Sequence, residues 1–195
     1  MTSLVKNSAS FGFTYSVSSL SVSSSSYKPE NALVDNDSPF FHSAGDVPGQ
    51  WWQISFSKQV AISSYFIRTN KVWSNRLTSW HIDASNDTVT WKTVHTVKGK
   101  DIGGNTEIFY PNDIIHCFHF RVVHDQNTNS NNYLHLTFFD CFGELSTIQT
   151  NKVRRYCNTG FIQCLISFQP FILTLINFCF FFFFFFFFKK KILFI

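Results

Sequence analysis

The sequence predicts an all-β domain, an antiparallel β-sandwich, over residues 16–146. Apolar and polar residues alternate in several short runs, turn-forming residues separate these runs, and no stretch shows the 3.6-residue period of a helix. With 195 residues and 45% hydrophobic content, the chain can form one domain with a buried core and an appendage. We expect residues 1–15 to be a flexible arm that feeds an edge strand, and residues 147–195 to be a tail outside the domain.

The segment Trp80–Trp91 predicts the central pair of strands. Its first half alternates large apolar residues with polar ones, which is the pattern of a strand with one face in a core. Residues 85–88, Ser-Asn-Asp-Thr, then close a turn because their side chains bond to nearby backbone groups. A second alternating run leaves the turn, and its first residue is Trp91. Four aromatic side chains are predicted to lie in the core: Trp52, Trp80, Trp91 and Phe120.

The remaining strands follow from the same alternation. Trp52, Ile54 and Phe56 share one face of the first long strand. Residues 27–50 precede it, and their prolines and glycines predict a long loop over one rim of the sandwich. Further strands are predicted at 60–69, 108–110, 117–124 and 133–142, with loops at 70–77, 99–105 and 125–132.

Six segments, taken in order, resemble the motifs of one known family. They are 31–37 (NALVDND), 50–56 (QWWQISF), 60–69 (VAISSYFIRT), 80–91 (WHIDASNDTVTW), 120–123 (FRVV) and 138–143 (FFDCFG). Together they resemble the discoidin domains, also called coagulation factor 5/8 type C domains, over residues 16–145. The resemblance implies a jelly-roll sandwich of the galactose-binding-like fold that binds and does not catalyse. The sequence departs from the family pattern at three positions: Ser55 and Asp140 replace acids of the motifs, and Thr88 replaces a glycine.

Charge and motifs exclude two classes of function. Residues 1–145 carry ten basic against twelve acidic residues, and an acidic body with no basic stripe argues against a nucleic-acid partner. The sequence contains no nucleophile elbow, P-loop or dinucleotide fingerprint, so we expect no enzyme and no catalytic residue. His116 and His119 are three apart on a predicted strand, so they should face opposite ways and not share a metal.

A calcium site is the one cofactor hypothesis, and no other cofactor is expected. Residues 35–38, Asp-Asn-Asp-Ser, collect oxygen ligands of the kind that calcium prefers. In relatives that bind calcium, this loop and the acid before the closing glycine supply the ligands. The resemblance therefore implies a site made of Asp35, Asp37, Ser38 and Asp140. An Asx turn that caps the loop is an equal alternative.

Ligand recognition in this fold uses loops at one end of the sandwich. Planar hydrogen-bonding groups beside an aromatic face are suited to sugars, and Trp73 with its neighbours offers that combination. An indole that plugs the end of the sandwich is the structural alternative, and a weak lipid contact through Trp73 is another. The candidate binding residues are His42, Trp73, Asn75, Arg76, Asn129 and Asn131.

The cysteines favour a reducing compartment. All five lie beyond residue 116, so none near the start can form the terminal disulfide of the secreted relatives. Residues 1–27 also lack the continuous apolar stretch of a signal peptide. These absences and the ending FFDCFG at 138–143 are similar to the intracellular members of the family, which are attached to scaffold proteins. The resemblance therefore implies a cytoplasmic module that binds a protein, with carbohydrate binding as the alternative.

Residues 171–188 form an almost wholly apolar run that ends in nine phenylalanines and is followed by three lysines. Eighteen residues at about 1.5 Å each are just long enough to span a bilayer core. One hypothesis is a C-terminal membrane anchor that would make the protein a membrane-anchored display module. The other is a translated AT-rich stretch, because homopolymeric T and A triplets encode phenylalanine and lysine.

Overall fold

The computed structural model describes residues 1–69, 76–102, 104–105, 107–129 and 131–146. The candidate binding residues Trp73 and Asn75 and the apolar segment 171–188 lie outside the described residues. In the described part of the chain, no helix is both long and apolar enough to cross a membrane. The anchor hypothesis for 171–188 therefore stays a prediction.

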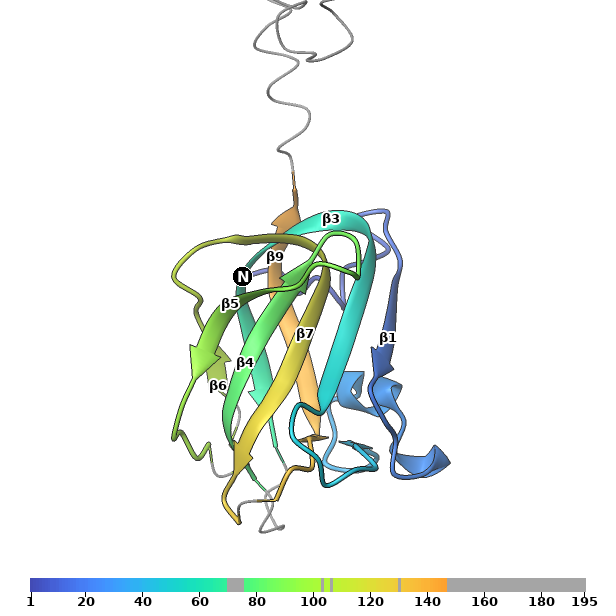
Figure 1. The fold of residues 1–195 in the computed structure, drawn as a ribbon. Coiled ribbons are helices and arrows are strands. Elements are labelled where there is room, and N and C mark those ends of the chain that lie inside the picture. The colour runs from blue at the N-terminus through green and yellow to red at the C-terminus, as the bar shows by residue number, and fades with distance from the viewer. Residues whose placement is uncertain (70–75, 103, 106, 130, 147–195) are drawn as a thin grey trace, which may run out of the picture. The chain divides into compact units, whose positions relative to one another are not determined.

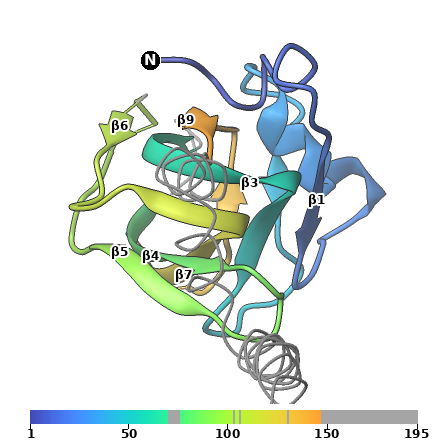
Figure 2. The same cartoon turned by 90° about the horizontal axis from the view of Figure 1, so that it is seen from above.

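Residues 1–146 form a β-sandwich, as predicted, in which one bent strand joins the two layers (Figure 1). The first layer has the strand order β1-β3-β7-β4-β5, and β6 and β9 pair with the second half of β3 to form the other. Figure 2 shows the two layers from above. The long strands are β1 (Tyr15–Ser19), β3 (Trp51–Arg68), β4 (Leu77–Ser85), β5 (Lys92–Val97), β7 (Ile115–Asn127) and β9 (Phe138–Leu145), with the short β6 (Glu107–Phe109).

The two strands predicted at 50–56 and 60–69 are one continuous strand, β3. Its pairing with β7 shifts register between Ser55 and Val60, and the exposed Ser57 and Lys58 lie at this bend. Even-numbered residues face the core on both sides of the bend, so Ile54 and Ile62 are both fully buried. Because β3 folds over from one layer to the other at this bend, both of its ends reach the same end of the sandwich (Figure 1).

The segment 27–50 contains short elements that the sequence did not predict. Strand β2 (Phe41–His42) pairs with β8 (His135–Leu136) in a separate two-stranded sheet. Two 3-10 helices, η1 (Ser25–Tyr27) and η2 (Pro29–Leu33), precede β2. The carbonyl of Pro29 accepts a hydrogen bond of 2.9 Å from the indole of the fully buried Trp52. This bond ties the loop to the core.

Large aromatic rings fill the space between the layers. The rings of Trp52 and Phe139 lie 4.7 Å apart, and Phe120 packs 5.9 Å from Phe139. The Trp80 indole donates to the hydroxyl of Tyr65 (3.1 Å), which lies 2.7 Å from Nδ1 of His95. Trp52, Trp80 and Phe120 are fully buried.

Trp91 is not a core residue, which corrects the sequence prediction. The pairing of β4 with β5 contains a bulge: Ile82 faces His95, but the next residue, Asp83, faces Thr93. One extra residue in β5 moves every preceding side chain to the other face of the sheet. Trp91 therefore lies half-buried on the outer face, where its indole donates a 3.0 Å bond to the Thr88 carbonyl.

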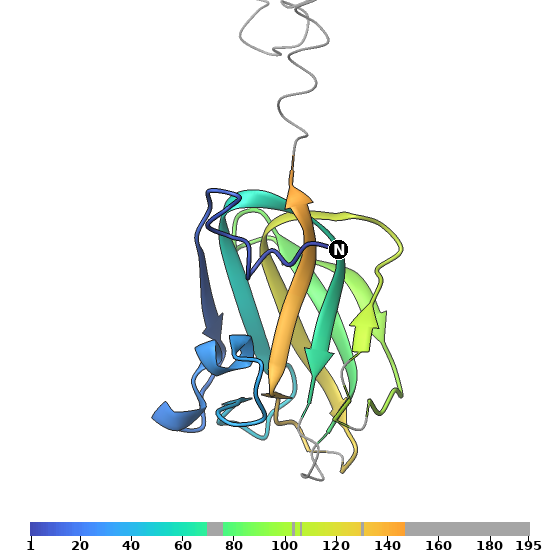
Figure 3. The ribbon, with the colours of Figure 1, turned by 180° about the vertical axis from the view of Figure 1, so that it is seen from behind.

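The N-terminal residues pack against β9 and do not form the flexible arm that was predicted (Figure 3). Leu4 is fully buried in the core, and its N–H donates to the carbonyl of Cys141 (2.8 Å). The N–H of Gly143 donates to the carbonyl of Thr2 (3.1 Å). A Cβ at Gly143 would lie 1.9 Å from the Ala61 carbonyl oxygen, so only glycine lets β9 approach β3 here.

Candidate functional site

Rings from three separate segments gather around His42 at the loop end of the sandwich. The ring of His42 lies 5.1 Å from Tyr133, 5.9 Å from Tyr27 and 5.3 Å from His135. Phe40 closes the group, 4.4 Å from His135 and 4.8 Å from Tyr27. The pairing of β2 with β8 brings these segments together, because it places His42 directly opposite His135. We call these five residues the ring cluster.

The hydrogen bond of His42 fixes its tautomer. Its Nδ1 lies 2.7 Å from the Ser43 carbonyl, which can only accept, so Nδ1 carries the hydrogen. Burial lowers the pKa of His42, and the bond to Ser43 only partly opposes this effect. The ring is therefore neutral near pH 7 and Nε2 is a hydrogen-bond acceptor. Burial lowers the pKa of the adjacent His135 further, to about 3, with the neighbouring His42 as a smaller cause.

The loop after β7 presents amides beside the ring cluster. Asn127 is buried, and its amide donates to Oδ1 of Asn131 (2.6 Å) and to the Tyr133 carbonyl (2.7 Å). The N–H of Asn131 lies 3.4 Å from Oδ1 of Asn129. These bonds hold the predicted residues Asn129 and Asn131 in the same loop as Tyr133, which itself contacts His42.

Arg76 joins this loop through its backbone, but its side chain pairs with an acid. The backbone N–H and C=O of Arg76 both bond to Thr128, at 3.3 and 2.9 Å. The guanidinium forms a bidentate ion pair with Asp101, in which Nε donates to Oδ1 (2.9 Å) and Nη2 donates to Oδ2 (2.5 Å). The hydrogen bond to Asp101 raises the pKa of Arg76. The cation is thus partnered inside the protein.

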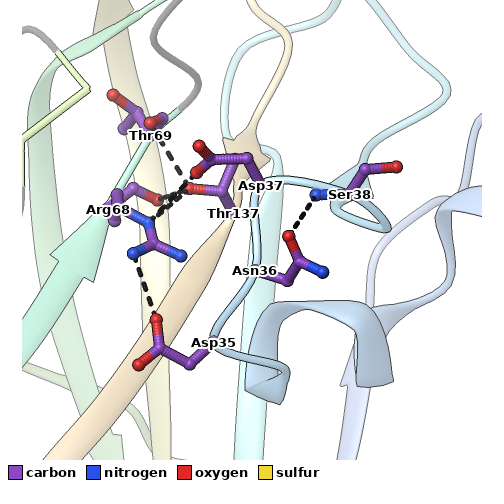
Figure 4. A network of polar contacts seen from close by, with 7 residues as sticks. All are labelled: Asp35, Asn36, Asp37, Ser38, Arg68, Thr69 and Thr137. Atoms are coloured by element: carbon purple, nitrogen blue, oxygen red, sulfur yellow. Dashed lines mark hydrogen bonds and ion pairs between the residues drawn. The ribbon is translucent and has the colours of Figure 1, made fainter.

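The predicted calcium loop holds an arginine between its acids (Figure 4). Nη1 of Arg68 lies 3.1 Å from Asp35, and its Nε lies 3.5 Å from Asp37. Ser38 is exposed, and its backbone N–H lies 3.5 Å from Oδ1 of Asn36, as in an Asx turn. The loop therefore has the geometry of an Asx turn, which the sequence left open as the alternative to a calcium site.

Asp140, the fourth predicted calcium ligand, is directed to other donors. Its Oδ1 accepts from the Ser3 hydroxyl (2.9 Å) and from the N–H of Cys141 (2.8 Å). Burial raises the pKa of Asp140, and the bond to Ser3 opposes this. Asp35 and Asp140 line one pocket of about 450 Å³, which Lys6 also lines. Among the described residues no group of three or more His, Cys, Asp or Glu side chains is arranged to hold a metal. The calcium hypothesis stays a prediction, and Arg68 pairs with two of its four residues.

His116 and His119 serve different neighbours. Nδ1 of His116 lies 3.0 Å from the Ser146 hydroxyl, and Nδ1 of His119 lies 2.9 Å from the Ser55 hydroxyl. The sequence did not identify Tyr27, Tyr133, His135 or Asp101 as parts of the loop end. An aromatic residue beside a predicted loop is a weak signal, and the β2–β8 pairing that assembles the cluster links residues more than ninety positions apart.

Fold and site together define a β-sandwich binding module that presents a loop-built surface at one end. The F5/8 type C domain model matches residues 15–137. The chain therefore belongs to the F5/8 type C, or discoidin, domain family, which confirms the resemblance seen in the sequence. No curated protein sequence matches the chain.

Solved structures of low sequence identity share the fold. The family 32 CBM (carbohydrate-binding module) of Clostridium perfringens NanJ, solved with galactose, has a TM-score of 0.59 and 14% identity and covers 72% of this chain and 97% of its own. A second Clostridium perfringens module, solved with GalNAc-β-1,3-galactose, has a TM-score of 0.58 at 11% identity, covering 73% and 100%. Chitosan-binding module 2 of a Paenibacillus chitosanase/glucanase was solved with chitotriose. It has a TM-score of 0.57 and 20% identity, and the match covers 66% of this chain and 95% of its own.

Proposed function

We propose that this chain is a carbohydrate-binding module that holds a neutral glycan at the loop end of its sandwich. The observation that carries the proposal is the position of His42, a neutral ring set between Tyr27 and Tyr133 with its Nδ1 hydrogen directed to Ser43. Such a site combines an oriented acceptor with aromatic faces, and both are needed to bind a sugar ring. Protein interaction, which the sequence favoured, becomes the second candidate.

The charges at the loop end favour a neutral ligand over an acidic one. The guanidinium of Arg76 donates two hydrogen bonds to the carboxylate of Asp101, so the charge of Asp101 already balances that of Arg76. The pKa of His42 is lowered by burial, so the imidazole adds no positive charge at pH 7. The same loop carries amide side chains such as that of Asn131, and amides suit hydroxyl groups. Relatives in fold were solved with galactose, with chitotriose and with an unsaturated mannuronic acid, which supports a glycan ligand here without selecting its charge.

A glycan array probed with the full-length chain tests this proposal. The chain should bind a defined set of neutral glycans, and His42→Ala should lose that binding. His116→Ala is the matched control, because this exposed histidine bonds only to Ser146 among the described residues, near the end of β9. An array with no signal, or binding that His42→Ala leaves intact, would contradict the proposal. Trp73→Ala, in the loop predicted from the sequence, extends the test to that residue.

Protein binding is the second candidate because apolar side chains are exposed near the loop end. Leu20 and Val47 are each about half exposed, at 52% and 53%. Leu20 bonds through its N–H to the Trp51 carbonyl at the start of β3, and Val47 follows Asp46, which accepts two bonds from Asn132. If proteins are the ligands, Leu20→Ser and Val47→Ser should weaken a purified complex while His42→Ala does not. For either ligand we propose a cytoplasmic location, supported by the free, buried thiols of Cys117 and Cys141.

A further inference from the structure

The outer face of the first layer carries a row of polar side chains far from the ring cluster in sequence. In register across the sheet, Gln53 on β3 faces Arg121 on β7, Arg121 faces Asp83 on β4, and Asp83 faces Thr93 on β5. Their neighbours in the chain, such as Ile54, Phe120 and Ile82, point into the core. Arg121, which is partly exposed, therefore lies at the centre of this row, beside Gln53, which is buried.

Two indoles flank the guanidinium of Arg121. Its Cζ lies 3.6 Å from the centroid of the Trp91 ring and 4.1 Å from that of Trp51. Both indoles are half-buried, so part of each stays exposed on the outer face. The hydrogen bond from Trp91 to the Thr88 carbonyl fixes one of the two rings. The guanidinium is thus held in one orientation by cation–π contacts.

Arg121 differs from the two other arginines in the described residues. Arg68 and Arg76 both form ion pairs with aspartates, whereas no carboxylate in the described part of the chain lies within ion-pair distance of Arg121. Its Nη2 donates to Oε1 of Gln53 (3.0 Å), but Nε is buried without a hydrogen-bond partner among the described residues. Burial lowers the pKa of Arg121, and the charge of Asp83 only partly opposes this effect. A cation that is desolvated to this extent attracts a further anion.

The hydrogen bonds beside Arg121 direct a second donor outward. The Gln53 amide donates to the Ser55 hydroxyl (2.9 Å), which lies 2.9 Å from Nδ1 of His119. Burial lowers the pKa of His119, and the neighbouring Asp87 opposes this. In the neutral ring Nδ1 accepts from Ser55, so the hydrogen lies on Nε2. His119 and Arg121 are two residues apart on β7, about 7 Å, which suits two groups of one ligand.

The nearest acid on this face has its own partners. Oδ1 of Asp83 accepts from the Thr93 hydroxyl (2.7 Å), and its Oδ2 lies 3.6 Å from Nε2 of His81. The same imidazole bonds to Asp125 at 2.9 Å. Asp83 therefore attracts Arg121 only from beyond ion-pair distance, because its carboxylate is bonded to Thr93.

We infer that this face is a second binding site, for an acidic saccharide whose carboxylate pairs with Arg121 while a sugar ring packs against the exposed parts of Trp51 and Trp91. The two indoles favour sugar rings over an acidic peptide, whose side chains have no comparable apolar face. The charge complementarity between a uronate and Arg121 selects this ligand class.

Calorimetric titration of the full-length chain with trigalacturonate tests the inference. Galactotriose is the neutral control of equal length, and triglutamate is the acidic control without a sugar ring. We expect saturable binding of trigalacturonate only, weakened by salt. Arg121→Gln should lower the affinity about tenfold or more, because it removes a charge-assisted contact. Lys58→Gln removes one positive charge at the exposed bend of β3 and should leave the affinity for trigalacturonate unchanged.

Three results of this titration would count against the second binding site. No binding of trigalacturonate, equal binding of either control ligand, or unchanged binding by a folded Arg121→Gln variant would overturn the inference. If that variant does not fold, the unaltered chain decides: trigalacturonate should shift the indole N–H resonances of Trp51 and Trp91 and leave that of the buried Trp80 in place. A shift of neither resonance would also overturn it.

Discussion

Nη1 of Arg68 lies 3.1 Å from Oδ1 of Asp35, in the loop where the family resemblance implied a calcium ion. The same guanidinium reaches Asp37 at 3.5 Å, so one side chain supplies positive charge to both acids. Arg68 is only 17% exposed and also donates to the hydroxyl of Thr137, which directly precedes the paired strand β9. A fixed arginine thus connects this loop to the strand ends beside it.

The first prediction concerns calcium. Calcium bound only to the folded state would raise the melting temperature. Because Arg68 already pairs with Asp35 and Asp37, we expect the full-length chain to melt at the same temperature in calcium and in EGTA. Arg68→Gln should lower the free energy of unfolding by about 1 kcal/mol, since its partners are largely exposed. Lys58→Gln controls for the loss of one charge. A higher melting temperature in calcium would refute this account of the loop.

The second prediction concerns the turn after β4. Thr88 has a φ of 65°, in the left-handed region that residues branched at Cβ tolerate poorly. Thr88→Gly should therefore stabilise the protein by about 0.5–1 kcal/mol, after allowing for the greater freedom of glycine in the unfolded chain. Thr90→Gly, two residues on without positive φ, should destabilise it. Urea denaturation of both variants decides, and a loss of stability in Thr88→Gly would show that the backbone is not strained there.

The third prediction concerns acid. Burial lowers the pKa of His42, His95 and His124 and lowers that of His135 to about 3, so the folded state favours neutral rings. The unfolded chain binds protons from about pH 6.5 downward, so this stability is full above pH 6.5 and is lost as the pH falls toward 3. His135 alone should account for about 2 kcal/mol between pH 7 and pH 5. His135→Gln should flatten the pH profile of urea midpoints, whereas His116→Gln should not; a profile that is flat in the unaltered chain would contradict this.

The fourth prediction compares two tryptophans. Trp80→Ala should cost about 3–5 kcal/mol because it leaves a cavity in the core. Trp91→Ala should cost less than about 2 kcal/mol, since it removes one hydrogen bond and the cation–π contact with Arg121 on the outer face. Equal losses of unfolding free energy would place Trp91 back in the core.

Alternation of apolar residues was enough to predict the sandwich and most of its strands. It located Trp52, Trp80 and Phe120 correctly because the alternation continues past each of them, to the fully buried Ile54, Ile82 and Val122. It failed at Trp91, where the bulge in β5 reverses the faces, and an unpaired residue leaves no mark in a single sequence. It also missed that Leu4 packs beside β9 and that Phe13 packs on Phe56 of β3, because both are isolated apolar residues among polar ones.

The site was harder to predict than the fold because its parts meet only through long-range pairing. His42 was a candidate, but its neighbours Tyr133 and His135 reach it through the β2–β8 ladder. From the sequence, the acidic loop at 35–38 was as consistent with a calcium site as with an Asx turn. The ion pairs of Arg68 with Asp35 and Asp37 appear only in the structure. Ion pairs of this kind depend on how side chains meet across strands, which residue spacing does not encode.

Calorimetric titration of the tightest neutral glycan from the array into the full-length chain tests the central claim most directly. We expect saturable binding at one site, loss of the heat signal in His42→Ala, and unchanged affinity in His116→Ala. Saturable binding that His42→Ala retains, or no heat with any neutral glycan, would contradict the claim that the ring cluster is a sugar-binding site.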